Sequence, residues 1–426
     1  MKLIRTVLAA FLTLTLSVTP SEVSAEWRQF RGPGSAGKSE DAGLPLKWSP
    51  TKNVAWRVEL GGYGSSSPII VGDRVFVTSY GGYGLDAERP GKQADLALRL
   101  HAYELATGKE VWTRKVAPVL PEHGYDDFLP EHGYASGTPV SDGEAVFCYF
   151  GKSGLHAFSV EGKFLWSAIT GSGTHRFGSG TSPLLFNDLV IVNAFVESGS
   201  IHAYNKRSGD NVWSTGGLSD AWCTPVLVDV PGGKPEVVIS NEGPLLGLDP
   251  ESGKKLWSCE GIDDYVCPSV VSHNGVVYAL GGRRSVKAVA VRAGGRGEIT
   301  KTHRLWKSKE GSKVPSPVYH EGHLYFVQHT GIAYCVEAAT GKVIYKKRLE
   351  GLGSDNKTYA SVHLAGKRLY AVTCYGGTFV LEAAPKFRQL AHNRLADNTA
   401  FNASPAISGK RLLLRSDRAL YCLTEE

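Results

Sequence analysis

The sequence lacks several motifs that mark common enzyme classes, and it lacks the charge clustering typical of nucleic-acid-binding proteins. Its 426 residues include a single methionine, at position 1, and no long run of like charge. No Gly-x-Ser-x-Gly and no HExxH is present, so two common hydrolase classes lack their motif. The seven cysteines form no CxxC, which leaves a zinc site of the usual spacing unsupported. The net charge of +6 is spread along the chain, and without a clustered basic face we expect no nucleic acid partner.

Long apolar stretches are also scarce, and the one present lies at the start of the chain. Lys2 and Arg5 precede the apolar residues 7–18, and the small-residue sequence Val-Ser-Ala ends at residue 25. This order is typical of a secretory signal, which we assign to residues 1–25. The apolar stretch is too short to span a bilayer, and no later segment reaches its length, so we expect no transmembrane segment. The mature protein is therefore expected to be exported, periplasmic or extracellular, and soluble.

The remaining chain is rich in short apolar runs separated by turn residues. Residues 182–213, SPLLFNDLVIVNAFVESGSIHAYNKRSGDNVW, contain four such runs, each bounded by Gly, Asn, Asp or Ser. Four short strands joined by tight turns predict one antiparallel meander. The unit recurs, which indicates a repeat protein, and 50 glycines and 21 prolines suit many strands and turns.

Each repeat begins with a Ser/Thr-x-Pro or similar step. After a first interval of 71 residues the steps recur every 42 to 49, at Pro68, Pro139, Pro183, Pro225, Pro268, Pro317, Val362 and Pro405. The eighth repeat ends without a fourth strand, whereas residues 53–60 resemble a fourth strand that stands alone. The sequence therefore predicts an all-β fold: an eight-bladed β-propeller of four-stranded antiparallel blades, closed by pairing of the N-terminal strand with the C-terminal blade. Seven blades are the fallback if the weak seventh repeat forms none. Residues 26–426 would form one domain, with 26–52 as a lead-in.

Once aligned, the repeats share the pattern A-x-(D/E/N)-x-x-(S/T)-G-x-x-x-W. It occurs as AYELATGKEVW, as AYNKRSGDNVW and, slightly altered, as GLDPESGKKLW, ending at Trp112, Trp213 and Trp257. This pattern resembles the pyrroloquinoline-quinone (PQQ) repeat. In that repeat the Gly takes a left-handed turn conformation and the Trp packs between blades, roles that suit both residue types.

The resemblance implies two kinds of function. The PQQ-repeat family includes PQQ-dependent alcohol dehydrogenases, which also use Ca²⁺, and the outer-membrane assembly factor BamB, which binds no quinone. This chain lacks the adjacent cysteine pair of the dehydrogenases and any CxxCH haem motif. We therefore interpret the protein as an exported binding or scaffold module, with a role in envelope protein assembly. A PQQ-dependent oxidoreductase is the first alternative and a glycan-binding propeller the second.

Two insertions enlarge the first interval, and the second carries a duplicated Pro-Glu-His-Gly-Tyr sequence. Six carboxylate and imidazole groups within eleven residues could hold Ca²⁺ or a transition metal, or transfer protons. A polar loop closed by its own hydrogen bonds is the simpler explanation. The candidate metal ligands are Glu122, His123, Asp126, Asp127, Glu131 and His132.

Aromatic residues precede most of the steps and predict a second candidate site. Equivalent positions in successive blades lie on a ring, so these side chains could form a cup at the channel mouth for a planar ligand, a sugar or a protein partner. Packing between blades is the alternative. Arg283 could add a contact to a carboxylate. The candidate ligand-binding residues are Tyr63, Tyr134, Phe177, Trp222, Tyr265, Tyr359, Phe401 and Arg283.

Cys223 and Cys267 precede the prolines of two consecutive repeats. They could therefore lie close together, which leaves a disulfide between them open.

Overall fold

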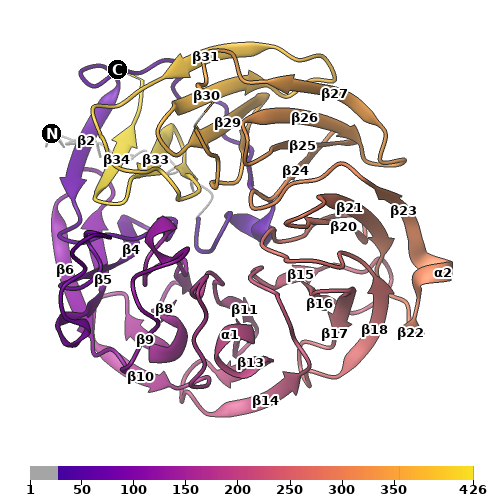
Figure 1. Ribbon diagram of the computed structural model, residues 1–426, viewed down its shortest axis with the longest axis horizontal. Helices are drawn as coiled ribbons and strands as arrows, with labels where there is room; N and C mark the ends of the chain where they lie inside the picture. The colour runs from indigo at the N-terminus through magenta and orange to yellow at the C-terminus, as the bar shows by residue number, and fades with distance from the viewer. Residues whose placement is uncertain (1–26, 355, 426) are drawn as a thin grey trace, which may run out of the picture.

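The computed structural model describes residues 27–354 and 356–425, so the predicted secretory signal lies outside it. The described chain forms eight four-stranded sheets arranged as blades around a ring, two of them extended by a fifth strand (Figure 1). The predicted fold class and blade count are both confirmed. No helix in the described part of the chain is long and apolar enough to cross a membrane.

Every blade is an antiparallel meander whose first strand lies nearest the ring centre. Blades 1 to 4 consist of β3 (Ile69–Val71), β4 (Arg74–Gly81), β5 (Ala97–Glu104) and β6 (Glu110–Val116); β7 (Val140–Ser141), β8 (Ala145–Tyr149), β9 (Leu155–Ser159) and β10 (Phe164–Ala168); β11 (Leu184–Phe186), β12 (Leu189–Ala194), β13 (Ser200–Asn205) and β14 (Asn211–Gly216); and β15 (Val226–Val228), β16 (Glu236–Ser240), β17 (Pro244–Leu248) and β18 (Lys255–Glu260).

Blades 5 to 8 repeat this arrangement. They consist of β19 (Val271–His273), β20 (Val276–Gly281), β21 (Lys287–Arg292) and β23 (Arg304–Ser308); β24 (Val318–His320), β25 (His323–Val327), β26 (Ile332–Glu337) and β27 (Val343–Arg348); β28 (His363–Ala365), β29 (Arg368–Thr373), β30 (Gly377–Glu382) and β31 (Gln389–Asn393); and β32 (Ala406–Ser408), β33 (Arg411–Arg415), β34 (Ala419–Leu423) and β2 (Val54–Glu59). The weak seventh repeat thus forms a complete blade.

The remaining elements are short additions to the blades. A parallel strand extends blade 4 at its outer edge, and another extends blade 7 at its inner edge. These additions are β22 (Gly297–Glu298), β1 (Lys38–Ser39), the α-helices α1 (Phe195–Ser198) and α2 (Thr300–His303), and the 3-10 helices η1 (Pro33–Ser35), η2 (Gln93–Asp95), η3 (Leu129–Glu131) and η4 (Gly151–Ser153).

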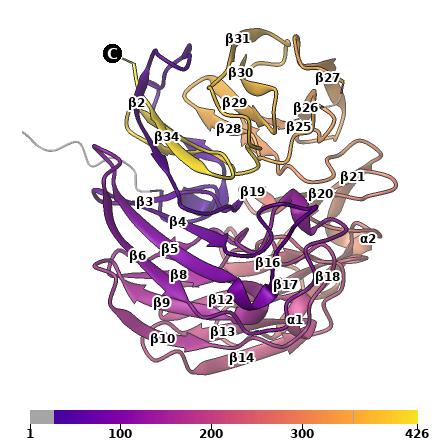
Figure 2. The ribbon, with the colours of Figure 1, turned by 60° about the vertical axis from the view of Figure 1, so that its left-hand side comes forward.

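The two ends of the chain meet in blade 8, as the unpaired strand predicted. Strand β2 pairs antiparallel with β34, with Val58 opposite Leu420, and the two lie side by side in both ribbon views (Figures 1 and 2). The pairing completes blade 8 and closes the ring, so no end of the ring exposes an unpaired blade face. The blade is held by a core that both ends of the chain contribute to.

Tryptophans at the edges of five blades link each of these blades to the next. In five blades the indole lies against a Gly turn of the following blade, and its N–H donates to a backbone carbonyl there over 2.9 to 3.1 Å. The glycines have φ between +69° and +86°, and a Cβ on any of them would lie under 3 Å from the indole. Only Gly supplies this conformation without strain or clash, which confirms the roles implied by the repeat. The pairs are Trp56 with Gly108, Trp112 with Gly162, Trp166 with Gly209, Trp213 with Gly253 and Trp306 with Gly341.

The described part of the lead-in, which starts at residue 27, crosses the centre of the ring (Figure 1). Trp27 pairs with Ile70 of blade 1, and the guanidinium of Arg28 donates to the carbonyl of Asp142, next to blade 2. The fully buried Arg31 donates to the Pro317 carbonyl, next to blade 6, and β1 then joins blade 7. The sequence did not predict these contacts, through which the lead-in connects widely separated blades.

Candidate functional site

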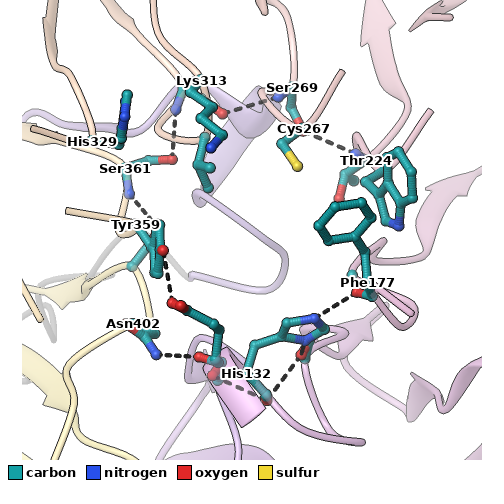
Figure 3. Close-up of a pocket in the computed structure, with 18 of the residues that line it drawn as sticks. His132, Phe177, Thr224, Cys267, Ser269, Lys313, His329, Tyr359, Ser361 and Asn402 are labelled. Atoms are coloured by element: carbon teal, nitrogen blue, oxygen red, sulfur yellow. Dashed lines mark hydrogen bonds between the residues drawn. The ribbon is translucent and has the colours of Figure 1, made fainter. Parts of the chain in front are cut away.

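The inner ends of the blades surround a central cavity of about 450 Å³ (Figure 3). All eight blades or the loops that precede them contribute to its lining, and Phe30 of the lead-in lies against it as well. Its volume falls in the range of small-molecule sites, about 300 to 1,000 Å³. A propeller channel with the lead-in across it therefore offers one pocket on the ring axis.

A belt of serine and threonine hydroxyls runs around this cavity. In seven successive pairs, the backbone N–H of one belt residue donates to the hydroxyl oxygen of the next blade's belt residue, over 2.9 to 3.0 Å. All eight residues line the cavity and are 1% to 5% exposed. They are Ser67, Thr138, Ser182, Thr224, Ser269, Ser316, Ser361 and Ser404. The belt explains why each repeat places a Ser or Thr next to its step.

The belt also corrects the predicted register of the fifth repeat. Thr224 and Ser316 both precede a proline, but the matching residue in blade 5 is Ser269, which precedes Val270. Pro268 was therefore the wrong starting point, because the hydroxyl, and not the proline, occupies the equivalent position.

One side of the cavity is aromatic. The ring centroids of Trp222 and Tyr265 lie 4.6 Å apart, and those of Phe177 and Tyr265 lie 5.2 Å apart. Phe128, from the second insertion, stacks on Phe177 at 4.4 Å, and the Arg283 guanidinium lies 5.5 Å from the Phe177 centroid. Phe177 and Thr224 lie on this side in Figure 3. The arrangement offers flat apolar faces beside a cation.

The opposite side is polar and mostly cationic. The Glu131 carboxylate accepts hydrogen bonds from the Lys357 ammonium and the Tyr359 hydroxyl, each over 2.7 Å. Burial raises the pKa of Glu131, but these two partners outweigh it and hold the pKa below its ordinary value. Lys313 and His329 complete this side, and Figure 3 places both away from Phe177.

The histidines that line the cavity are held in their neutral form. Burial lowers the pKa of His132, whose ring nitrogens contact the Ser136 hydroxyl at 2.5 Å and the Phe177 carbonyl at 2.6 Å. Burial, with the charges of Lys313 and Lys357, also lowers the pKa of His329. Even with both histidines neutral, the lining carries a net positive charge, because Arg283, Lys313 and Lys357 outnumber the single carboxylate, Glu131.

The structure brings together five of the eight predicted ligand-binding residues. Phe177, Trp222, Tyr265, Tyr359 and Arg283 line the cavity. The other three predicted residues, Tyr63, Tyr134 and Phe401, do not line it.

Tyr63 packs edge-on against Tyr80 at 6.5 Å, within a group of tyrosines that the two insertions help to form. Tyr134 belongs to the same group, with Tyr80 at 5.4 Å. Phe401 packs against Tyr421 at 5.9 Å in the core of blade 8. These three aromatics therefore support the fold around the cavity.

The six predicted metal ligands separate into three groups. Ligand atoms of His123, Asp126 and Asp127 lie within 4.8 Å of one another on the second insertion. Glu122 instead accepts a hydrogen bond from the Ser153 hydroxyl over 3.3 Å, and burial raises its pKa to about 7. Glu131 and His132 line the central cavity. Metal binding by the first group remains a prediction.

Cys223 and Cys267 are both free thiols, so the disulfide that the sequence left open is absent. The Cys223 thiol donates to the Ser240 carbonyl over 3.1 Å, within its own blade. Cys267 lines the cavity beside Tyr265 and Ser269.

Sequence reasoning missed the belt as a functional surface, and it missed Lys313 and His329. The Ser/Thr in each step was the visible signal for the belt. Lys313 and His329 carry no such signal, because they occur once each, in loops of blade 6 outside the repeated pattern.

The fold and this cavity define a PQQ-repeat β-propeller with a pocket on its axis. A family model described as "Outer membrane protein assembly factor BamB" matches residues 97–347 and 300–425, and the chain belongs to that family. A curated BamB from Francisella tularensis subsp. tularensis (strain SCHU S4 / Schu 4) is 21% identical over 196 residues, 43% of this chain. The match spans 40% of that relative's length.

Solved structures share the fold at low sequence identity. BamB from Moraxella catarrhalis aligns with a TM-score of 0.60 and 14% identity, over 88% of this chain and 97% of that one. Quinohemoprotein alcohol dehydrogenase ADHIIG from Pseudomonas putida HK5 aligns with a TM-score of 0.62 and 9% identity, over 94% of this chain and 80% of that one. At these identities the likeness extends to the fold alone.

Proposed function

We propose that the protein is an exported, non-catalytic binding module that holds a small ligand in its central cavity. The observation that carries this proposal is the pocket itself: about 450 Å³ on the ring axis, with aromatic faces on one side and charged groups on the other. Such pairing of apolar surface with a few polar groups is what small-molecule sites generally have. Export is inferred from the secretory signal predicted in residues 1–25.

The quinoprotein alternative requires Ca²⁺ as well as PQQ, and the cavity does not fit the ion. Ca²⁺ takes six to eight oxygen ligands, usually with several carboxylates. Glu131 is the one carboxylate among the described lining residues, and it is already bound by Lys357 and Tyr359. The aromatic and cationic walls suit a planar anion, but we derive no redox step from them.

The glycan alternative rests on the aromatic faces, on which sugar rings could stack. Lys313 and Arg283 are cations that a neutral sugar would leave without a counter-charge. Neutral glycans are therefore a weaker match to this lining than acidic molecules.

The test is a thermal-unfolding screen of the mature protein against PQQ with and without Ca²⁺, neutral sugars and aromatic acids. A ligand selective for the native state raises the melting temperature by mass action. Gly180→Leu is the blocking variant, because Gly180 lines the cavity and an added Cβ would meet no atom within 4 Å. Gly216→Leu, on the exposed outer strand β14, is the control.

We expect at least one compound to stabilise the wild type and the Gly216→Leu variant saturably, but not Gly180→Leu. Equal stabilisation of all three would place binding outside the cavity and contradict the proposal. A screen without any stabilising compound would also contradict it.

A role in envelope protein assembly is the second candidate function. Besides the family, an exposed apolar row at the ring perimeter favours a protein partner: five edge strands each expose one residue directly before the edge tryptophan or tyrosine. These residues are Val111, Leu165, Val212, Leu305 and Ile344. Complementation of a deletion strain, scored by outer-membrane permeability, separates the two functions. Loss with Val212→Asp but not with Gly180→Leu would favour the partner role, and the reverse would favour the cavity.

A further inference from the structure

We propose that the cavity binds the oxyanion group of an acidic ligand, a carboxylate or a phosphate, against Lys313 and the hydroxyls of Ser269 and Ser316. The inference rests on the proposed small-ligand function and deepens it by naming the chemical class. Its experiment is chosen so that the two can fail separately.

The belt is the first argument, because its hydroxyl protons are unused. A hydroxyl has one O–H donor beside its acceptor lone pairs. In seven belt residues the oxygen already accepts a backbone N–H, for example Ser316 from Ser269 and Ser361 from Ser316. None of the eight hydroxyls donates to any residue that the structure describes. An occupant that presents acceptor oxygens would satisfy several of these donors at once.

The second argument is a cation without a partner. Lys313 is half-buried at the cavity wall and forms no ion pair or hydrogen bond with the described residues. The nearby Lys357, by contrast, is neutralised by Glu131 at 2.7 Å. His329 Nδ1 is buried without a hydrogen-bond partner on the same side. Figure 3 shows Lys313 between Ser269 and Ser361 along the cavity wall.

Charge decides between an anion and a cation as the occupant. Hydroxyl oxygens could also ligate a metal ion through their second lone pair. The side chains of Lys313 and Arg283 line the same cavity and form no ion pair with a carboxylate in the described part of the chain, so they would repel such an ion. An anion would be attracted by these cations and would also accept hydrogen bonds from the belt hydroxyls. Hydrogen bonds to a charged acceptor are about twice as strong as neutral ones.

The aromatic side of the cavity indicates what the rest of the ligand, beyond its acidic group, should be. Trp222 and Tyr265 line the same cavity as Lys313, and Phe177 packs between Tyr265 and Phe128. Figure 3 shows Phe177 across the cavity from Lys313. A ligand with a flat apolar body and an acidic group at one end would contact both sides. The class is therefore an aromatic or conjugated acid.

The experiment compares three probes of equal body and different head group: naphthoate, naphthyl phosphate and the neutral naphthylmethanol. Affinities are measured by calorimetry on the mature protein at pH 7.5, at one fixed salt concentration and without phosphate buffer. We expect one or both acids to bind at least about tenfold more tightly than the alcohol, the factor typical of a charge-assisted contact. The two acid arms distinguish carboxylate from phosphate as the natural head group.

Matched variants locate the acid. Lys313→Met keeps the apolar stem and should lower acid affinity about tenfold, to near that of the alcohol, whereas Lys309→Met, exposed four residues away, should leave it unchanged. Ser316→Ala should weaken acid binding several-fold. Ser141→Ala removes a buried hydroxyl that also accepts a backbone N–H but does not line the cavity, and it controls for the lost backbone hydrogen bond.

Equal affinity for acids and alcohol, or unchanged acid affinity in Lys313→Met, would overturn this inference. It would also be overturned if no acid bound while a neutral screened compound bound in a manner that Gly180→Leu abolishes; the proposed function would then stand. If no compound bound at all, both proposals would fail.

Discussion

The contact between edge tryptophans and Gly turns gives a prediction whose size follows from the structure. Gly209 has φ +78°, and a Cβ there would lie 2.7 Å from two ring carbons of Trp166. Ala at Gly209 would incur about 1–2 kcal/mol for the left-handed backbone. Overpacking against the indole would add about 1–3 kcal/mol. We therefore expect Gly209→Ala to lower the free energy of unfolding by about 2–5 kcal/mol.

Gly322 separates the two contributions. It has φ +79°, but a Cβ there would meet no atom within 4 Å. Gly322→Ala should lose only the backbone term, and any gain from a less flexible unfolded chain applies equally to both variants. The predicted difference between the variants is about 1–3 kcal/mol, the overpacking term alone.

The assay is urea unfolding followed by far-ultraviolet circular dichroism, with midpoints compared at equal slope. A Trp166→Ala background provides a second check, because removing the indole should reduce the Gly209→Ala loss to that of Gly322→Ala. Equal losses for the two glycine variants in the wild-type background would refute the reasoning. So would a Gly209→Ala loss that persists undiminished without the indole.

Three further predictions concern buried polar groups. Trp257→Phe should cost about 1–3 kcal/mol in urea unfolding, because the buried Glu236 carboxylate loses the indole donor at 2.6 Å while its Arg296 contact stays; an unchanged midpoint would contradict this. Burial raises the pKa of Glu122 to about 7, so the folded protein binds an extra proton between the ordinary carboxyl range and pH 7. Stability should therefore fall as pH rises from about 5 through 7, and Glu122→Gln should flatten that fall in thermal unfolding. The pKa of Glu131 is held below its ordinary value, so its advantage over Glu131→Gln should be present at neutral pH and disappear in acid; a pH-independent difference would contradict the assignment.

The sequence predicted the architecture well because the repeat encodes local geometry. A Gly turn, an edge tryptophan and four apolar runs recur in most units, and the lone strand at residues 53–60 identified the closing partner of β34. The predicted starting point of a repeat was wrong where that repeat departed from the pattern. The belt residue Ser269 follows Pro268 instead of preceding a proline, so alignment on prolines shifted the fifth repeat.

The cavity could be predicted only in part. Trp222 and Tyr265 were found because they recur next to the steps, but the same rule selected Phe401, which packs in a blade core. Lys313 was missed because it lies outside the repeat, and its importance comes from having no charged partner among the residues that the structure describes. The path of the lead-in was also missed, since the contact of Arg31 with Pro317 joins residues 286 apart in the chain.

The most direct test of the central claim is a crystal structure of the mature protein soaked with naphthoate. We predict electron density for one molecule in the central cavity, with its carboxylate at Lys313 and Ser316 and its rings against Trp222 and Tyr265. An empty cavity at a saturating concentration, or a molecule bound only elsewhere on the propeller, would contradict it.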